Sequence, residues 1–264
     1  MIDHPANSNL WIPQKPAIIR VASLRDIAPP ALASFMPGMA GVVGFTPGAP
    51  AGPVAISLTD DTFSTTAQTT FTFNGRAIGA AATTRDVLVV VAFRGNGGAR
   101  SISNATIGEG AATIDGDNSA RVDSVVMLRR RLASGTTADI SITFSGSVSH
   151  CGIAIYRMTG ASTAAPTTNH STSNGTSVTV NITVPAEGGA VGGNIADWTS
   201  VSAMGWSAGL NEDVEHSMAS GFVLSDYGSM TSATELSSQA FTATRSGNST
   251  GNAHMQVAVY SPAT

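Results

Sequence analysis

The sequence predicts an all-β protein: an antiparallel β-sandwich of jelly-roll type, preceded by an extended N-terminal arm. Hydrophobic residues make up 42% of the 264 residues, whereas charged residues make up only 11%. From Val54 onward, short apolar or alternating runs are separated by Gly, Ser, Asn and Asp, as in strands joined by turns. Long runs of helix-forming Ala, Leu, Glu and Lys are absent, and Lys15 is the only lysine.

Residues 1–52 differ in composition from the rest of the chain. They contain eight of the twelve prolines, which interrupt helices and central strands. They are nevertheless rich in large apolar residues, which a disordered linker lacks. We therefore expect an arm that buries these side chains on another surface, either the chain's own body or, preferably, a neighbouring subunit. The expected anchoring residues are Trp11, Ile12, Ile18, Ile19, Phe35, Met36 and Phe45.

The body, residues 53–264, is a succession of predicted strands. Residues 87–93 are apolar throughout, which predicts a central strand covered on both faces. Residues 140–144 and 178–184 alternate between apolar and polar, so each strand should bury one face. The other predicted strands are residues 70–73, 101–107, 124–129, 152–156, 190–195, 203–207, 220–224, 239–244 and 255–260.

Two segments of the body share a pattern. His150 to Tyr156 and His254 to Tyr260 both read His, three residues, Ala, a β-branched residue and Tyr. Each follows a Ser-Gly pair, at 145–146 and 246–247, which predicts a turn. The pattern hints at an internal repeat. The body is then either one domain or two related halves, residues 53–160 and 161–264.

Overall charge and composition limit the partners. The formal net charge is -4 and the pI is about 5.6, which provides no basic field for a phosphate backbone, so nucleic acid is not an expected partner. No stretch approaches the roughly eighteen apolar residues of a membrane span. The single cysteine, Cys151, lies in an apolar run and is expected to be a buried, inert thiol.

The chain offers few candidates for catalysis or metal binding. Three acidic groups occur in contexts that we interpret as turns, where carboxylates usually bond their own backbone. They are Asp60 with Asp61, Asp115 with Asp117, and Glu212 with Asp213 and Glu215. The run from Asp115 to Asn118 has alternating oxygen ligands but lacks the later Glu of a calcium loop, so a plain turn is favoured. Since no nucleophile or phosphate-binding motif is present, we expect no enzymatic activity, cofactor or metal.

Three aromatic residues suggest a different role. Trp198, Trp206 and Tyr227 would form a sugar-stacking platform for a host-surface glycan if they lay together on an exposed face. Packing in the core or at a subunit interface is the favoured alternative.

Several stretches of the chain resemble a known group of proteins, the uncharacterised virion structural proteins, of head-decoration or tail-fibre type, from phages and prophages of α-proteobacteria. In the body these stretches are residues 86–93, 107–113, 133–146 and 151–156. In the arm they are residues 11–13, 16–20 and 35–39. Together these regions span about half of the chain, and they are packing and turn sequences that carry over no catalytic residue.

The resemblance implies a structural protein located in the virion, with other capsid or tail proteins as partners. The arm would attach it to the particle, and the sandwich would be displayed as a decoration, fibre or spike. Homo-oligomers such as trimers are expected, because particles present repeated sites. A receptor- or glycan-binding module for host attachment is the alternative, and a polysaccharide-degrading enzyme is a weaker one.

Overall fold

The computed structural model describes residues 52–197, 201–219, 223–247 and 252–264. The expected anchoring residues of the arm, and Trp198, lie outside these ranges. The described residues form sixteen β-strands and no helix, and all strand pairs are antiparallel. The predicted all-β, antiparallel fold is therefore confirmed. Within the same ranges, no helix has the length and apolar character needed to cross a bilayer.

The first half of the body is a β-sandwich. Its strands are β1 (Ala55–Ser64), β2 (Gln68–Ala77), β3 (Asp86–Gly95), β4 (Ile102–Ile107), β5 (Gly110–Ala111), β6 (Thr113–Asp115), β7 (Asp123–Arg131) and β8 (Thr137–Thr159). One layer has the order β1-β8-β3-β7-β6 and the other has the order β2-β8-β4-β5. These are the two sheets of a jelly roll.

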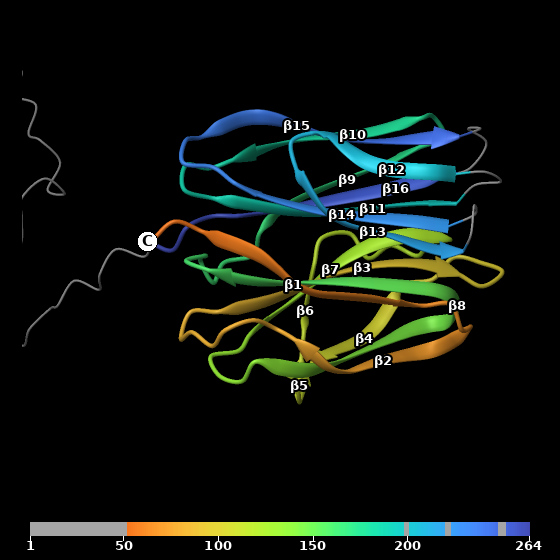
Figure 1. Cartoon of the computed structure of the whole chain (residues 1–264), viewed down its shortest axis with the longest axis horizontal. Helices are drawn as coiled ribbons and strands as arrows, with labels where there is room; N and C mark the ends of the chain where they lie inside the picture. The colour runs from red at the N-terminus through yellow and green to blue at the C-terminus, as the bar shows by residue number, and fades with distance from the viewer. Residues whose placement is uncertain (1–51, 198–200, 220–222, 248–251) are drawn as a thin grey trace, which may run out of the picture. The chain divides into compact units, whose positions relative to one another are not determined.

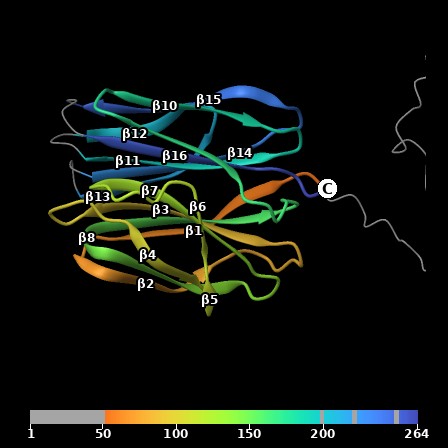
Figure 2. The same cartoon turned by 180° about the vertical axis from the view of Figure 1, so that it is seen from behind.

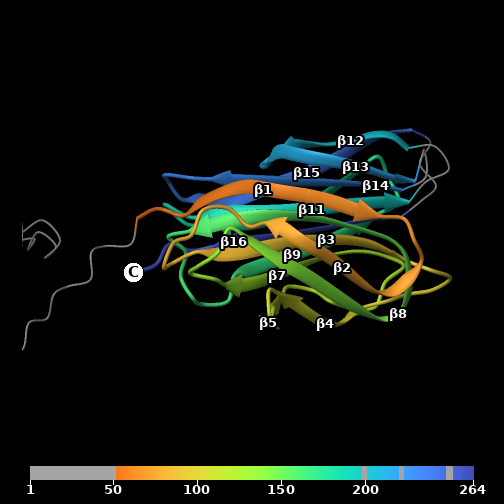
Figure 3. The ribbon, with the colours of Figure 1, turned by 60° about the horizontal axis from the view of Figure 1, so that its bottom comes forward.

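The long strand β8 belongs to both layers (Figure 3). Its first half pairs with β2 and β4, and its second half pairs with β1 and β3. The turn predicted at Ser145-Gly146 is wrong, because the strand continues through it. The side chain of Arg100 explains why residue 146 is a glycine. A Cβ at Gly146 would lie 2.5 Å from Nε of Arg100, which donates a hydrogen bond to the carbonyl of Ser147.

The second half of the body is a second β-sandwich. Its strands are β9 (Thr167–Ser173), β10 (Ser177–Val184), β11 (Gly189–Asp197), β12 (Val201–Ala208), β13 (Asn211–Ala219), β14 (Val223–Thr231), β15 (Leu236–Gly247) and β16 (Ala253–Tyr260). Its sheets have the orders β9-β16-β11-β14-β13 and β10-β15-β12. The first of these sheets contains the order β9-β16-β11-β14, which corresponds to β1-β8-β3-β7 of the first half. The second has the order β10-β15-β12, which corresponds to β2-β8-β4. The strand order of the first half is thus repeated.

The two sandwiches stack as four layers of strands (Figures 1 and 2). One apolar cluster fills each sandwich and a third lies between them. Strand β3 contributes Val89 to the first core and Val90 to the layer between the sandwiches, which confirms that it is covered on both faces. Strand β10 alternates between exposed and buried residues, as predicted.

The packing between the sandwiches depends on a glycine. Strands β3 and β11 face each other across the central layer. A Cβ at Gly193 of β11 would lie 2.7 Å from Cγ1 of Val90 and 2.9 Å from Cγ1 of Val125. Glycine therefore allows the two sheets to approach more closely than any other residue would.

The strands run between two ends of the body, which we call the base and the tip. The base is the end where Gly52, Pro53, Ala263 and Thr264 line one cavity, and it is marked by the letter C in Figure 1. The tip is the opposite end, where β7 begins at Asp123 and β16 begins at Ala253. Strand β7 spans the distance from tip to base, since its last residue, Arg131, lines the base cavity.

Candidate functional site

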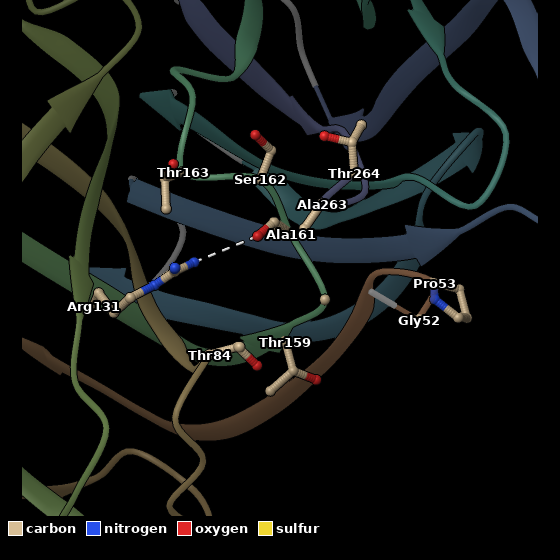
Figure 4. Close-up of a pocket in the computed structure, with 11 residues that line it drawn as sticks. Gly52, Pro53, Thr84, Arg131, Thr159, Ala161, Ser162, Thr163, Ala263 and Thr264 are labelled. Atoms are coloured by element: carbon tan, nitrogen blue, oxygen red, sulfur yellow. Dashed lines mark hydrogen bonds between the residues drawn. The ribbon is translucent and has the colours of Figure 1, made fainter. Parts of the chain in front are cut away.

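A cavity lies at the base (Figure 4). It has a volume of about 460 Å³. Arg131 supplies the charged side chain of its lining, and donates hydrogen bonds to Asp86 Oδ2 (2.6 Å) and to the carbonyl of Ala161 (3.4 Å). The remaining polar side chains of the lining are hydroxyls, those of Thr84, Thr159, Ser162, Thr163 and Thr264.

The base cavity is equipped for hydrogen bonding. The guanidinium of Arg131 is neutralised by Asp86, whose carboxylate is nearly buried. None of the hydroxyls that line it has a histidine or carboxylate beside it in the lining to act as a base. The lining therefore offers hydrogen-bond donors and acceptors, but no nucleophile with an activating partner.

Several of the carboxylates proposed from sequence are bonded within the protein. Asp60 accepts hydrogen bonds from Arg76 and from the amide of Ala77 (2.8 Å). Asp61 Oδ1 lies 2.8 Å from His216 Nε2, which joins β1 of the first sandwich to β13 of the second. The interpretation of these residues as turn carboxylates is wrong, since Asp60 and Asp61 lie within β1 and the acidic residues from Glu212 to Glu215 lie within β13.

The candidate calcium loop has structural partners. Asp115, at the end of β6, accepts from Arg129 Nε (2.9 Å), and Asn118 bonds both the amide and the carbonyl of Ile102. Burial alone would raise the pKa of Asp117, but hydrogen bonds from Ser119 and Arg121 lower it below its usual range. Across the described ranges, no three His, Cys, Asp or Glu side chains are arranged to hold a metal ion.

A buried acidic cluster was missed by the sequence analysis. Asp226 of β14 is fully buried, and neither carboxylate oxygen has a hydrogen-bond partner. Burial, and then the negative charges of Glu212 and Glu215, raise the pKa of Asp226 to about 8. Asn194 lies opposite it on β11, equally buried and with both amide atoms unpartnered. Asp226 is therefore predominantly protonated at neutral pH.

Of the three residues considered for an aromatic platform, Tyr227 is excluded by its burial. Tyr227 is 0% exposed and lies between the sandwiches, where its hydroxyl accepts from Ser225 Oγ (3.1 Å). It is therefore unable to stack on a glycan. Trp206 is partly buried and packs against the core of the second sandwich, which agrees with the favoured alternative. Trp198 lies outside the described residues.

A smaller pocket of about 250 Å³ lies at the tip. It is formed where the two sandwiches meet and is lined by Arg121, Asp123, Thr172, Asn252 and His254, with Val122 and Ala253. His254 is 1% exposed and Asp123 is 6% exposed. Nδ1 of His254 is 2.9 Å from the amide of Val125, whereas its Nε2 and the Oδ1 of Asp123 have no hydrogen-bond partner. The sequence repeat singled out His254, but no local signal connected it with Asp123.

Burial affects the ionisation of both groups in this tip pocket. It lowers the pKa of His254 to about 3, with the positive charges of Arg121 and His170 acting in the same direction. It raises the pKa of Asp123 to about 6, against the opposing effect of Arg94. At neutral pH the imidazole is neutral and the carboxylate is mostly charged.

The protein was compared with known families, curated proteins and solved structures. No family model matches the chain, and neither the search of curated proteins nor that of solved structures found a match.

Proposed function

We propose that the chain is a non-enzymatic structural protein of a bacteriophage-like particle. In this proposal, residues 1–52 attach it to a capsid or tail subunit, and the paired sandwiches are displayed on the particle surface as a decoration, fibre or spike. The sequence resemblance to virion structural proteins supports this proposal, and the all-β fold agrees with it.

The exposure of apolar side chains supports the proposal that the arm attaches the protein and the body is displayed. Among the described residues, the large apolar side chains that remain exposed are Phe63 (43%) and Val122 (40%). The described part of the body thus buries its own apolar surface and presents no large apolar patch for a particle subunit. The apolar residues available for attachment are those of the arm, such as Trp11 and Phe35.

The geometry of the base supports the same division. Gly52, the first described residue, lies at the base, where it lines the cavity. A segment that precedes Gly52 therefore enters the body at the base. The tip, at the far end of the strands, would then be available to the surroundings of the particle. Symmetric copies, such as trimers, would follow from attachment at repeated sites.

The proposal is tested with the full-length chain. The double variant Trp11→Ser with Phe35→Ser should be absent from purified particles, while far-UV circular dichroism and thermal unfolding remain those of the wild type. The control is Phe63→Ser, which removes the exposed aromatic residue of the body and should leave incorporation unchanged. Incorporation of the double variant at the wild-type level contradicts the role of the arm.

Host-glycan binding is a second candidate function, favoured by the unpartnered polar groups of the tip pocket. The polysaccharide-degrading enzyme has less support. Of its candidate carboxylates, Asp60, Asp61, Asp115 and Asp117 are bonded to cationic or backbone donors within the protein, which favours structural roles for these four. Among Glu212, Asp213 and Glu215, Glu215 accepts a hydrogen bond from the amide of Met204.

A further inference from the structure

His254 provides a fixed donor in the tip pocket. The amide of Val125 can only donate, so Nδ1 of His254 must accept its hydrogen bond. In the neutral imidazole the proton is then on Nε2, which makes Nε2 a donor. Because this donor is buried and without a partner, it carries a desolvation penalty unless a bound molecule accepts its hydrogen bond.

The same pocket contains one fixed acceptor. Oδ1 of Asp123 is buried and has no hydrogen-bond donor, and the closest cation, Nη1 of Arg94, is 3.9 Å away. Arg94 is also paired with Asp197. The carboxylate of Asp123 can therefore accept a hydrogen bond from a molecule in the pocket. Arg121, which also lines the pocket, is engaged by Asp117 through Nη2 (2.7 Å), while its Nε is unpartnered.

Donor and acceptor belong to residues that line the same pocket. Asp123 and Val125 are two residues apart on β7, so their side chains point to the same face, and the amide of Val125 holds His254 against that strand. A ligand that satisfies both groups must therefore accept one hydrogen bond and donate another. One hydroxyl group can both accept and donate a hydrogen bond. Alternatively, of two hydroxyls on adjacent carbons, one can accept from His254 and the other can donate to Asp123.

Other ligand classes match the tip pocket less well. A carboxylate or phosphate would face the negative charge of Asp123 without offering it a donor. An ammonium ion would suit Asp123 but has no acceptor for Nε2 of His254, and would lie beside the positive charge of Arg121. A metal ion would require the lone pair of Nε2, which carries the proton instead.

We propose that the tip pocket binds two neighbouring hydroxyl groups of a neutral carbohydrate, one accepting from Nε2 of His254 and the other donating to Asp123. The volume of about 250 Å³ is below the roughly 300–1,000 Å³ of pockets for drug-sized ligands, so it suits a single sugar ring. This site does not depend on attachment to a particle. It can be tested on the isolated full-length protein, and its failure would leave the proposed structural role untouched.

The experiment is a titration followed by NMR. Methyl glycosides of glucose, galactose and mannose, and N-acetylglucosamine, are added separately to the full-length chain. Long-range ¹H–¹⁵N spectra report the imidazole of His254, and saturation transfer reports the bound sugar. At least one sugar should shift the Nε2 signal in a saturable way, with a dissociation constant on the order of 1 mM, as few contacts allow. Ethylamine and acetate at the same concentrations should cause no such shift.

Two variants assign the contacts. His254→Asn places an amide oxygen near the position of Nδ1, so it can keep the bond to Val125 while the donor at Nε2 is lost. It should weaken binding roughly tenfold, as loss of one hydrogen bond implies, and Asp123→Ala should do the same. The matched control is His150→Asn, the same change at the corresponding position of the repeat, since His150 does not line the tip pocket. It should leave binding unchanged.

Each contrary outcome overturns the proposal. No shift of Nε2 with any of the four sugars, at concentrations roughly tenfold above the expected constant, would mean that the tip pocket holds only water. Binding that survives in folded His254→Asn, or a saturable shift with ethylamine or acetate alone, would show that the ligand chemistry is misassigned. If Asp123→Ala does not fold, the wild-type titration and His254→Asn still decide the question.

Discussion

The amide of Val125 in the first sandwich donates a hydrogen bond of 2.9 Å to Nδ1 of His254 in the second. Val125 lies within β7, and its amide is turned towards the other sandwich instead of being left without a partner. This bond connects the two halves at the tip and fixes the tautomer of the histidine. It also predicts how the histidine contributes to stability.

Replacement of His254 by Leu should destabilise the protein. The substitution leaves the buried amide of Val125 without an acceptor, which costs about 1–3 kcal/mol. His254→Asn can still accept from that amide and should retain more of the free energy of unfolding. Urea denaturation at pH 7 measures both variants. Equal stabilities of the Leu and Asn variants would show that the hydrogen bond does not contribute.

Asp226 should make stability depend on pH. Its folded-state pKa of about 8 is raised above the ordinary 3.8, so the folded chain keeps a proton that the unfolded chain releases between these values. The free energy of unfolding therefore decreases as pH rises from about 4 to 8, by up to about 1.4 kcal/mol per pH unit. Asp226→Asn stays neutral and should lose this dependence.

The measurement is urea denaturation of wild type and variant between pH 5 and pH 9. Asp139→Asn is the control, because Asp139 is an exposed carboxylate that accepts from the amide of Gly75. If the control and Asp226→Asn show the same pH dependence as the wild type, Asp226 does not carry the buried proton.

Gly193 should tolerate no side chain. In Gly193→Ala the new Cβ would lie 2.7 Å from Cγ1 of Val90, which overpacks the layer between the sandwiches at a cost of about 1–3 kcal/mol. Adding Val90→Ala should restore part of that loss, so the double-mutant cycle should show favourable coupling. Gly175→Ala, whose Cβ would meet only Ser173 Oγ at 3.4 Å, should change the melting temperature little. Additive effects of the Gly193 and Val90 changes would argue against this close contact.

Arg85 should be essential to the stability of the first sandwich. Its side chain is fully buried, and its guanidinium donates to the carbonyls of Gly79, Leu132, Ser134 and Gly135. Arg85→Met leaves these carbonyls without that donor and should lower the free energy of unfolding by about 3 kcal/mol or more. Arg85→Lys keeps the charge but not the several donors of the guanidinium. Its free energy of unfolding should therefore lie between those of the wild type and of Arg85→Met. Chemical denaturation measures the series, and a stable Met variant would contradict this role.

Local sequence patterns predicted the strands in which each face is either buried or exposed along its whole length. Strand β3 is apolar because both of its faces are covered, and β10 alternates because only one is. Strands β1, β5, β6, β9 and β13 were not predicted. In β13 the acidic residues from Glu212 to Glu215 hide the alternation, because this strand lies at the edge of its sheet, where polar side chains are tolerated.

The candidate sites were harder to predict than the strands. Asp226 lies in a strand whose burial depends on β11 and β12, which the sequence near Asp226 does not reveal. The tip pocket combines Asp123 and His254 from different sandwiches, and only the packing of the two halves brings them together. For Tyr227 the sequence left an exposed platform open beside the favoured core packing, because an aromatic residue near polar ones has the same local pattern in a core as on a surface. The role of the arm remains a prediction.

A cryo-EM map of the intact particle tests the proposed function most directly. The account predicts that the chain is present in a fixed number of symmetric copies, that residues 11–45 contact a different particle subunit, and that the tip faces outward. Absence of the chain from the particle, or arm residues that contact only their own body or solvent, would contradict it.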